Sequence, residues 1–438
     1  MSLGTNAQSS LLARQRWLVI GLVGLFVVVG VQYGRKVTVN SGRSAILRWN
    51  DPLLGLWEGD NIYERYQYPN PPIMAILLSP FANLSTFSAL LEALSWFYLK
   101  AGLLLLSLHW VFLMVQENGR PFPPWAKEGV VLLSIWPLMG DLTHGNINLF
   151  ILFLVIAGLY AFYRDWPVLC GLLLALAVSC KVTPALFVPY FVWKRSWKTL
   201  LGIGVGLVLF LWLAPGIWLG QERNAELFLS WWRQMVEPYI GGGIVYSGYE
   251  NQSLPGLIVR LFTHSPSFSN FDFIENIYVP LRYDNVVSLD HRITGWIIKG
   301  CMGAFSLAVV WLCRTPTTPP RDWRLAAEFA IVILGMLLFS ERTWKHHCVT
   351  LVLPFAVLLY ALVNVDLTPA LHCYLIGTLL ASALLMASAS ISLLDSFYGI
   401  SKWAHVYGVY VWTYALLLVS LLVLLGKQAS LSPGADNL

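Results

Sequence analysis

Long apolar runs recur along almost the whole sequence, and they leave little choice of fold. Several reach the roughly 20 residues that a helix needs to cross a bilayer, where every backbone polar group must be paired internally. The runs are Trp17 to Val31, Ala101 to Val115, Asn148 to Tyr163, Leu200 to Leu219, Ala304 to Cys313, Ala326 to Phe339, Cys348 to Val363, Leu375 to Leu393 and Tyr407 to Leu425, with shorter ones near Ile73, Val130, Val168 and Thr183. We therefore expect an all-α polytopic membrane protein with about 12 transmembrane helices.

Composition excludes an ordinary soluble domain, because 57% of the 438 residues are hydrophobic and only 12% are charged. No repeat of fixed period and no linker divides the chain, so we expect a single membrane domain over residues 1–438. The six cysteines lie in or beside apolar runs without metal-ligand spacing. We expect them to be buried small hydrophobes rather than a disulfide framework.

Basic residues in the short connections predict the orientation, since positive charge resists translocation. Counted along the expected helices, they fall on one side: Arg14, Arg16, Arg120, Lys127, Arg164, Lys194, Arg195, Lys198, Arg314, Arg321, Arg324 and Lys427. Both termini are thus expected in the cytoplasm, with extracytoplasmic loops at about 34–70 and 220–293. The first run lacks a small-residue cleavage pattern and is expected to remain as a span. The net charge of +5 is spread over many loops; it favours contact with anionic headgroups or phosphates and does not by itself indicate nucleic acid, and no nucleic-acid partner is expected.

Three polar segments interrupt the apolar pattern on the predicted outer side, and we expect them to converge on one site. They are Tyr63 to Pro72, His144 to Asn148 and Ser340 to His347. Polar and ionisable groups at membrane depth are costly, so those that persist usually line a cavity and act on a substrate. The imidazole and amides of the second segment suit sugar hydroxyls or phosphate oxygens. Capping of the next helix by Asn146 or Asn148 is the alternative.

The third segment holds two cations, two imidazoles, a carboxylate and an indole, more than the capping of a helix requires. No third ligand at a recognisable spacing accompanies His346 and His347, so we predict hydrogen bonding or phosphate contact and no metal there. Lys181 lies three residues before Pro184, which ends the helix and lets the ammonium point inward. A lysine that snorkels to the headgroups is the alternative.

The second outer loop contains one helical pattern. Leu227, Trp231 and Met235 recur at helical spacing within Asn224 to Val236. This spacing predicts a helix lying on the membrane interface, either bordering a lipid entrance or serving only to pack.

In their order, these segments resemble the polyprenol-phosphate-dependent glycosyltransferases of family 87, members of the GT-C membrane superfamily. The resemblance spans nearly the whole chain. Gly59 to Pro72 is similar to the family's glycine, tyrosine and Tyr-Pro-Pro pattern, with Asn70 inserted between the prolines. The other four motifs are short. His144 to Asn148 is similar to the family's Gly-Gln-x-Asn, with Asn146 in place of glutamine, and Lys181 to Pro184 is similar to its Lys-x-x-Pro. Asn251 to Ser253 with Arg260 is similar to its Asn-x-Ser followed by arginine, and Trp344 to His346 is similar to its Trp-x-His.

The resemblance implies a GT-C fold and an inverting transfer on the outer face of a bacterial plasma membrane. The expected donor is a polyprenyl-phosphate hexose such as mannose, and the acceptor is a lipid or glycan. No metal or other cofactor is expected, and the sequence contains no Asp-x-Asp pair. A lipid-linked sugar transporter or flippase is the alternative, although no inverted repeat is visible.

One departure from the family concerns the general base. The family's presumed base is an aspartate shortly after the first span, and this chain has Ser41 to Ile46 there, without a carboxylate. We predict that Asp51, then Asp60, then Asp141 takes its place, a solvated loop carboxylate being the alternative for each. A catalytically silent binding relative is a third hypothesis for the same reason.

The remaining candidates serve binding and charge stabilisation. An inverting transfer needs fixed cations where negative charge grows on the departing phosphate. We predict this task for Lys181, Arg260, Lys345 and His346, with His346 a catalytic candidate beside the three carboxylates. The predicted substrate-binding residues are Arg48, Tyr68, His144, Asn146, Asn148, Lys181, Asn251, Arg260, Trp344, Lys345 and His347.

Overall fold

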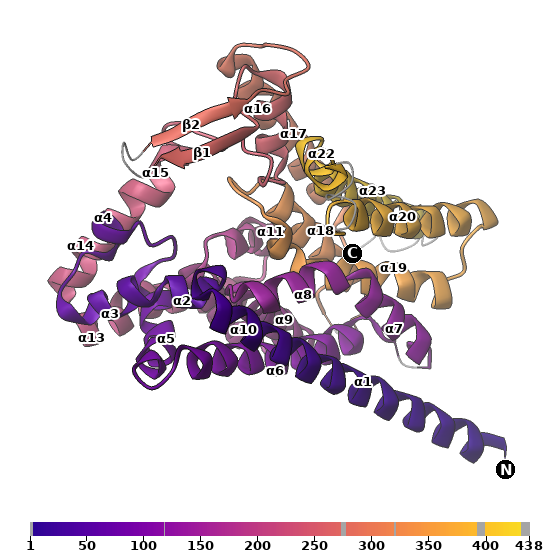
Figure 1. The fold of residues 1–438 in the computed structure, drawn as a ribbon. Helices are drawn as coiled ribbons and strands as arrows, with labels where there is room; N and C mark the ends of the chain where they lie inside the picture. The colour runs from indigo at the N-terminus through magenta and orange to yellow at the C-terminus, as the bar shows by residue number, and fades with distance from the viewer. Residues whose placement is uncertain (1–2, 118, 273–276, 319–320, 392–398, 431–438) are drawn as a thin grey trace. The chain divides into compact units, whose positions relative to one another are not determined.

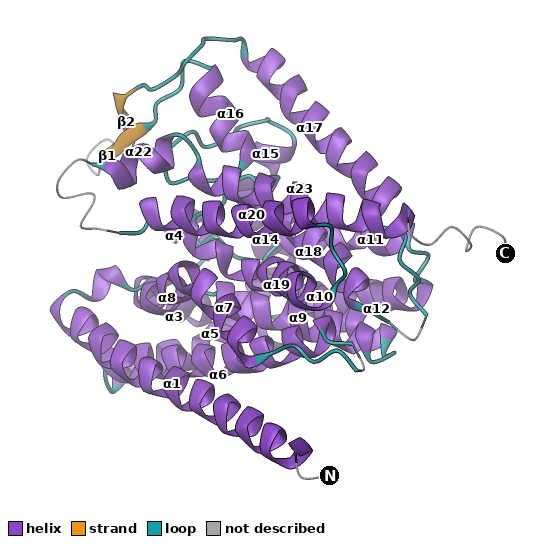
Figure 2. Cartoon of the chain, turned by 90° about the vertical axis from the view of Figure 1, so that its right-hand side faces the viewer, coloured by secondary structure: helices purple, strands orange, loops and turns teal. Residues whose placement is uncertain are grey.

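The computed structural model describes residues 3–117, 119–272, 277–318, 321–391 and 399–430. Across these ranges nearly all regular structure is helical, as predicted, and a two-stranded hairpin is the exception (Figure 2). Residues 273–276 of the second predicted outer loop and the last two residues of the run Leu375 to Leu393 lie outside the described residues.

The chain divides into two compact units. Unit 1 comprises Met1–Val182 and Leu201–Gln234, and unit 2 comprises Thr183–Leu200 and Met235–Leu438. The expectation of a single membrane domain stays a prediction. The main helices of unit 1 are α1 (Leu3–Val39), α2 (Ala45–Arg48), α3 (Asn50–Glu58), α4 (Ile62–Tyr66), α5 (Pro72–Ala82), α6 (Ala89–Val115), α7 (Pro124–Leu133), α8 (Ile135–His144), α9 (Asn148–Tyr163), α10 (Pro167–Cys180), α13 (Ala214–Leu219) and α14 (Gln221–Trp231).

Helix α9 lies at the core of unit 1. It is apolar on every side, and such a helix is stable only when it is surrounded by protein or lipid. It packs against α6 and α10, and α6 in turn packs along α1 (Figure 1). Helices α5 and α10 begin with a proline, which suits the first helical turn because its missing N–H needs no partner there.

Two turns shape one end of unit 1. Gly59 ends α3 with a φ of +107°, and Gly220 joins α13 to α14 with a φ of +87°. Both positions favour glycine because a side chain is strained at positive φ. The turns therefore reverse the chain tightly and bring α4 against α14.

A π-helical segment, Val208–Leu213, connects α12 (Trp197–Leu207) to α13. Wider turns of this kind leave backbone carbonyls without their usual partners. The buried Asn224 supplies one, because its Nδ2 donates to the carbonyls of Leu211 at 3.0 Å and Trp212 at 3.4 Å. Helix α12 begins in unit 2 and continues in unit 1.

Unit 2 is built around α18, in which every residue from Leu325 to Leu338 is buried. Its strands form an antiparallel pair within the second predicted outer loop (Figure 1), a hairpin that the expectation of an all-α fold did not include. The elements of unit 2 are α11 (Phe187–Trp193), α15 (Glu237–Ile240), α16 (Leu254–Phe262), β1 (Phe268–Asp272), β2 (Ile277–Arg282), α17 (His291–Leu312), α18 (Trp323–Leu338), η6 (Lys345–Leu351), α19 (Val352–Asn364), α20 (Pro369–Ser388), α22 (Ile400–Val406) and α23 (Val409–Ser430).

Seven described segments are long and apolar enough to cross a bilayer, which confirms a multispanning membrane protein. They are Val19–Val39, Ala89–Val115, Trp197–Leu219, His291–Leu312, Lys345–Asn364, Pro369–Ser388 and Val409–Lys427, and shorter apolar helices occupy Pro72–Thr86, Asn148–Tyr163, Pro167–Cys180 and Thr183–Trp193. The run near Val130 forms two ten-residue helices, α7 and α8, that meet at Ser134.

The helix predicted over Asn224 to Val236 is present as α14 and a following π-helical turn. Its Leu227 and Trp231 are buried within unit 1, where α14 packs on α4 and α5. The Trp231 indole donates to the Pro69 carbonyl at 3.3 Å. The predicted apolar face therefore serves packing, while Leu229 and Trp232 on the remaining surface are exposed.

Candidate functional site

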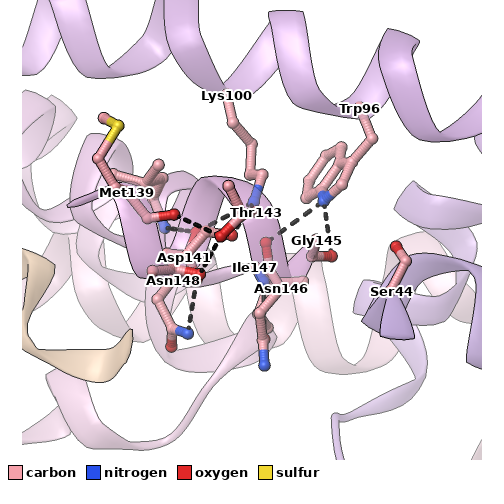
Figure 3. A network of polar contacts seen from close by, with 12 residues as sticks. Ser44, Trp96, Lys100, Met139, Asp141, Thr143, Gly145, Asn146, Ile147 and Asn148 are labelled. Atoms are coloured by element: carbon pink, nitrogen blue, oxygen red, sulfur yellow. Dashed lines mark hydrogen bonds and ion pairs between the residues drawn. The ribbon is translucent and has the colours of Figure 1, made fainter. Parts of the chain in front are cut away.

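A buried polar network joins the second predicted polar segment to Lys181. Figure 3 shows its part around Lys100, Asp141 and Asn148. The Lys100 ammonium, from α6, donates to the Asp141 carbonyl at 2.7 Å and to its Oδ2 at 3.1 Å. Asn148 donates from Nδ2 to the other oxygen of this carboxylate at 2.9 Å. Lys181 then donates to Asn148 Oδ1 at 2.6 Å. Asn148 is thus held between a buried ion pair and the half-buried Lys181.

The surroundings of Asp141 favour a structural role over the predicted role of general base. Asp141 and Lys100 are both fully buried. Asp141 Oδ2 also accepts from the Leu149 backbone N–H at 3.3 Å, at the start of α9. A backbone N–H at the start of α9 is therefore capped by Asp141, whereas the alternative considered from the sequence was capping by Asn146 or Asn148. Asn146 instead accepts from its neighbour Ile147 at 2.7 Å, and its carbonyl accepts from the Trp96 indole at 3.3 Å.

A second group of basic side chains surrounds the end of α8. Arg48 Nη2 lies 3.4 Å from His144 Nε2, and Arg48 Nη1 donates to the Gly42 carbonyl at 2.8 Å. Lys36 donates to the Thr143 carbonyl at 2.7 Å. Burial, followed by repulsion from Arg48, lowers the pKa of His144 to about 4. The imidazole is thus neutral at physiological pH and accepts the Arg48 hydrogen bond.

Tyr68 is buried near the end of α10. Only 1% of Tyr68 is exposed, and its ring contacts those of Trp49 and Tyr63 at centroid distances of 5.9 and 6.3 Å. The thiol of Cys180, the last residue of α10, is close enough to act electrostatically on the Tyr68 hydroxyl. The hydroxyl faces the Asn70 side chain without a hydrogen bond of ordinary geometry. Unit 1 therefore brings Tyr68 close to the end of α10, where Lys181 follows Cys180.

Asp60 sits in the tight turn between α3 and α4. Arg65 Nη1 donates to both carboxylate oxygens at 2.7 Å, and the Tyr66 hydroxyl donates to Oδ2 at 3.0 Å. These hydrogen bonds, from Arg65 first, hold the pKa of Asp60 below its ordinary value. Asp51 is exposed in the first turn of α3 and acts electrostatically on the same Tyr66. Asp51 and Asp60 thus belong to one group around Tyr66, and Asp141 belongs to another.

A cavity of about 520 Å³ borders Asp60. Its walls come from the two glycine turns and the start of α14: Gly59, Asp60, Asn61, Leu219, Gly220, Gln221, Glu222, Arg223, Glu226 and Leu227. Asn61 donates from Nδ2 to Ser230 Oγ at 2.9 Å and to Glu226 Oε1 at 3.4 Å. Arg223 donates to the Leu56 carbonyl. These bonds tie α3 and the Gly59 turn to α14 beside the cavity.

In unit 2, Arg260 is buried and bound to backbone. Nε donates to the Val406 carbonyl at 2.8 Å, and the two terminal nitrogens donate to carbonyls of 247, 248, 251 and 405 at 2.8 to 3.3 Å. Burial lowers its pKa to about 10, which leaves it charged at neutral pH. A guanidinium engaged in this way favours a structural role over the phosphate contact predicted for it.

Asn251 is equally engaged. Its Nδ2 donates to the carbonyls of Tyr246 at 2.8 Å and Glu341 at 3.0 Å, and its Oδ1 accepts from the Thr343 N–H at 3.0 Å. The motif Asn251 to Ser253 therefore fastens the outer loop to the segment that precedes η6. The neighbouring Ser253 caps α16 by accepting from the Gly256 N–H at 3.1 Å.

The third polar segment forms the start of η6. His346 is buried, and its ring meets those of Trp344 and His347 edge-on at 5.5 and 4.9 Å. His347 Nδ1 accepts from the Trp344 N–H at 3.3 Å, while Lys345 is exposed. The Trp344 indole nitrogen is buried and, among the described residues, has no hydrogen-bond acceptor. The structure thus gathers these four candidates at one helix start within unit 2.

Most of the chain matches a known protein family. Residues 68–341, more than half of the 438 residues, match glycosyltransferase family 87. The chain belongs to glycosyltransferase family 87. This confirms the resemblance drawn from the five motifs.

Two curated relatives match part of the chain. A polyprenol-phosphate-mannose-dependent alpha-(1-2)-phosphatidylinositol mannoside mannosyltransferase of Mycolicibacterium smegmatis is 31% identical over 215 residues, 45% of each chain. The protein of the same name from Mycobacterium tuberculosis is 31% identical over 140 residues, 30% of this chain and 32% of its own. The matches therefore span less than half the length of either relative.

Among solved structures, the crystal structure of ArnT from Cupriavidus metallidurans bound to undecaprenyl phosphate is 16% identical to this chain. The alignment covers 94% of this chain and 79% of ArnT, with a TM-score of 0.37.

Sequence reasoning missed two basic residues that contact α8, the helix that carries the candidate site residues Asp141 and His144. Lys100 neutralises Asp141 from a helix that reads as an ordinary apolar span, although a lysine at its centre was a usable signal. Lys36 lies at the end of the first span, where basic residues are common. A third missed network, in unit 2, pairs Lys194 with the buried Glu328 at 2.9 Å and engages Tyr190 and the backbone of Thr315. Its donors and acceptors satisfy one another, which indicates a structural role.

Proposed function

We propose that the chain is a membrane glycosyltransferase that moves mannose from a polyprenyl-phosphate donor to an extracytoplasmic lipid or glycan acceptor, with inversion. Membership of family 87 over residues 68–341 carries this proposal, and the names of the two relatives supply the donor and the mannosyl group. We also propose the GT-C bundle of about 12 transmembrane helices, a bacterial plasma membrane, and cytoplasmic termini.

The donor phosphate has a suitable partner in the basic groups of unit 1. Arg48 and Lys181 are linked through α8. Arg48 contacts His144 of α8, and Asp141 of the same helix accepts a hydrogen bond from Asn148, which in turn accepts one from Lys181. Arginine offers a planar fork for phosphate oxygens, and lysine a mobile point charge. We assign these two cations to the phosphate, with the neutral His144 and the Asn148 amide as further polar partners.

The carboxylate of choice for the general base is Asp60. It borders a cavity and keeps 21% of its side chain exposed although Arg65 pairs with it, whereas Asp141 is fully buried with Lys100 and Asp51 is exposed at the start of α3. In the proposed step, Asp60 takes the proton of the acceptor hydroxyl while the hydroxyl oxygen bonds to the anomeric carbon from the face opposite the phosphate. The bond from that carbon to the phosphate oxygen breaks, and polyprenyl phosphate leaves with the electron pair. The phosphate is a good leaving group at neutral pH, so fixed cations suffice to stabilise its growing charge.

The roles proposed for unit 2 are narrower. Within unit 2, Trp344, Lys345, His346 and His347 remain proposed substrate-binding candidates, supported by the buried Trp344 indole nitrogen. Asn251 and Arg260 are proposed to shape the outer loop rather than to touch the substrate, because their donors are occupied by backbone carbonyls.

Transfer by purified protein in lipid nanodiscs tests the proposal. With polyprenyl-phosphate mannose labelled in the sugar and a phosphatidylinositol mannoside acceptor, we expect acceptor-dependent loss of donor. Asp60→Asn should lower kcat by about 10²- to 10⁴-fold, the usual contribution of a general base, without changing the thermal unfolding midpoint. Glu237→Gln, an exposed carboxylate of α15, is the matched control.

Three results argue against parts of the proposal. An unchanged kcat in Asp60→Asn with a large loss in Asp51→Asn moves the base to Asp51. Donor movement across the bilayer without transfer favours the lipid-linked sugar flippase. Donor binding without transfer or transport favours a catalytically silent relative, which the missing carboxylate at Ser41 to Ile46 already suggests.

A further inference from the structure

The cavity beside Asp60 has a chemistry unlike that of the basic group around Arg48. Its side chains include three carboxylates, Asp60, Glu222 and Glu226, and one cation, Arg223. Arg65, outside the lining, pairs with Asp60, so the excess negative charge comes from Glu222 and Glu226 against Arg223. Two amides, Asn61 and Gln221, complete the polar lining. Like charges repel strongly at short range. A phosphate is therefore disfavoured in this cavity, while neutral hydroxyl groups, which donate hydrogen bonds to carboxylates, are favoured.

The size and the walls also suit a sugar ring. A volume of about 520 Å³ lies within the usual range for small-molecule sites. The Gly59 turn is fixed to α14 by Asn61, which bonds both Glu226 and Ser230, and α3 is fixed to α14 by Arg223, which bonds the Leu56 carbonyl. Walls that are held by such bonds before a ligand arrives lose little freedom when it binds.

We propose that this cavity binds the sugar headgroup of the acceptor, a neutral group rich in hydroxyls, and presents one hydroxyl to Asp60. The inference rests on the proposed transferase function and adds the place and chemical class of its second substrate. Unit 1 then separates its two ligands by charge: basic side chains of α2 and the end of α10 for the donor phosphate, and acidic side chains of the glycine turns for the acceptor sugar. Glu226 and Gln221 serve as binding residues, and Leu219 forms part of the apolar wall.

Binding without donor tests the cavity separately from the reaction. Methyl α-mannopyranoside at millimolar concentration, added to the full-length protein in nanodiscs, should give saturation-transfer NMR signals. Leu219→Trp, which fills the cavity, and Glu226→Gln, which removes a charged acceptor while keeping its size, should reduce these signals. Glu237→Gln should leave them unchanged. Glu226→Gln covers the case in which the larger tryptophan prevents folding.

Kinetics supply the second measurement. With phosphatidylinositol mannoside as the acceptor, Glu226→Gln and Gln221→Ala should each raise the acceptor KM about tenfold, the effect of losing one hydrogen bond to a charged or amide group. The donor KM should not change.

The outcomes separate this inference from the proposed function. Mannoside signals that survive both Leu219→Trp and Glu226→Gln, or variants that raise the donor KM as much as the acceptor KM, overturn the acceptor cavity. Transfer by wild-type protein that binds no mannoside overturns it too, and leaves the transferase standing. Signals lost in both variants, in a protein without transfer activity, support a sugar-binding cavity and refute the transferase.

Discussion

Replacing Lys100 with methionine would leave Asp141 as a buried carboxylate without its cation. The ammonium and the carboxylate are both fully buried and lie 3.1 Å apart. The remaining bonds to Asp141, from Asn148 at 2.9 Å and the Leu149 N–H at 3.3 Å, do not neutralise its charge. The methionine itself fits, because it retains most of the length of the lysine stem.

The expected loss is large. Removing one partner of a buried ion pair typically costs about 3–5 kcal/mol, because the other charge is left uncompensated in a medium of low dielectric constant. We expect Lys100→Met to lower the free energy of unfolding of unit 1 by about this amount. Lys100→Met combined with Asp141→Asn should recover part of it, because the second change removes the orphan charge while an amide oxygen still accepts from Asn148.

Chemical unfolding in detergent, followed by tryptophan fluorescence, measures these differences, and transfer activity is assayed on the same samples. If Asp141 is structural, the single variants lose stability and activity together, and the double variant regains both. If Asp141→Asn abolishes transfer at unchanged stability while Lys100→Met unfolds no more easily than wild type, Asp141 is the base and our assignment of Asp60 is wrong.

Three further variants probe the other clusters. Arg260→Ala should lower the free energy of unfolding by at least about 2 kcal/mol because several buried carbonyls lose their donor; a raised donor KM at wild-type stability would instead show phosphate contact. Arg65→Ala should raise the pKa of Asp60 and move the acid limb of the kcat/KM profile to higher pH; an unmoved limb contradicts the role of Asp60 as base. His144 has a pKa of about 4 in the fold against 6.5 ordinarily, so the unfolded chain binds more protons between these values and stability should fall as pH drops from 6.5 to 4. His144→Gln should flatten that part of the curve, and unfolding midpoints measured across it provide the check.

Local signals in the sequence predicted the elements well. Pro184 predicted that the helix ends close to Lys181, and in the structure α10 ends at Cys180, the residue before Lys181. The apolar runs form helices because a segment surrounded by lipid or apolar side chains must pair its backbone N–H and C=O groups internally. The hairpin of β1 and β2 was missed because its short strands lie in a long polar stretch, where aromatic residues indicated headgroup contact instead.

Long-range partners could not be predicted. The polar character of His144 to Asn148 was evident, but the cation that pairs with Asp141 comes from a helix 41 residues earlier in the chain. Arg260 matched its motif, yet its acceptors are carbonyls of residues 405 and 406 as well as of the adjacent loop. Neither partner leaves a spacing pattern, since both depend on how the helices pack.

The π-helical segment Val208–Leu213 has a consequence for evolution and engineering of this chain. An extra residue in a helix turns everything after it by about 100°, because an α-helix has 3.6 residues per turn. Deleting one residue there would restore regular pitch, rotate Leu219 away from its present wall and strip Asn224 of its acceptors. Length changes in this helix are therefore expected to abolish the proposed sugar recognition even where they leave its hydrophobicity untouched.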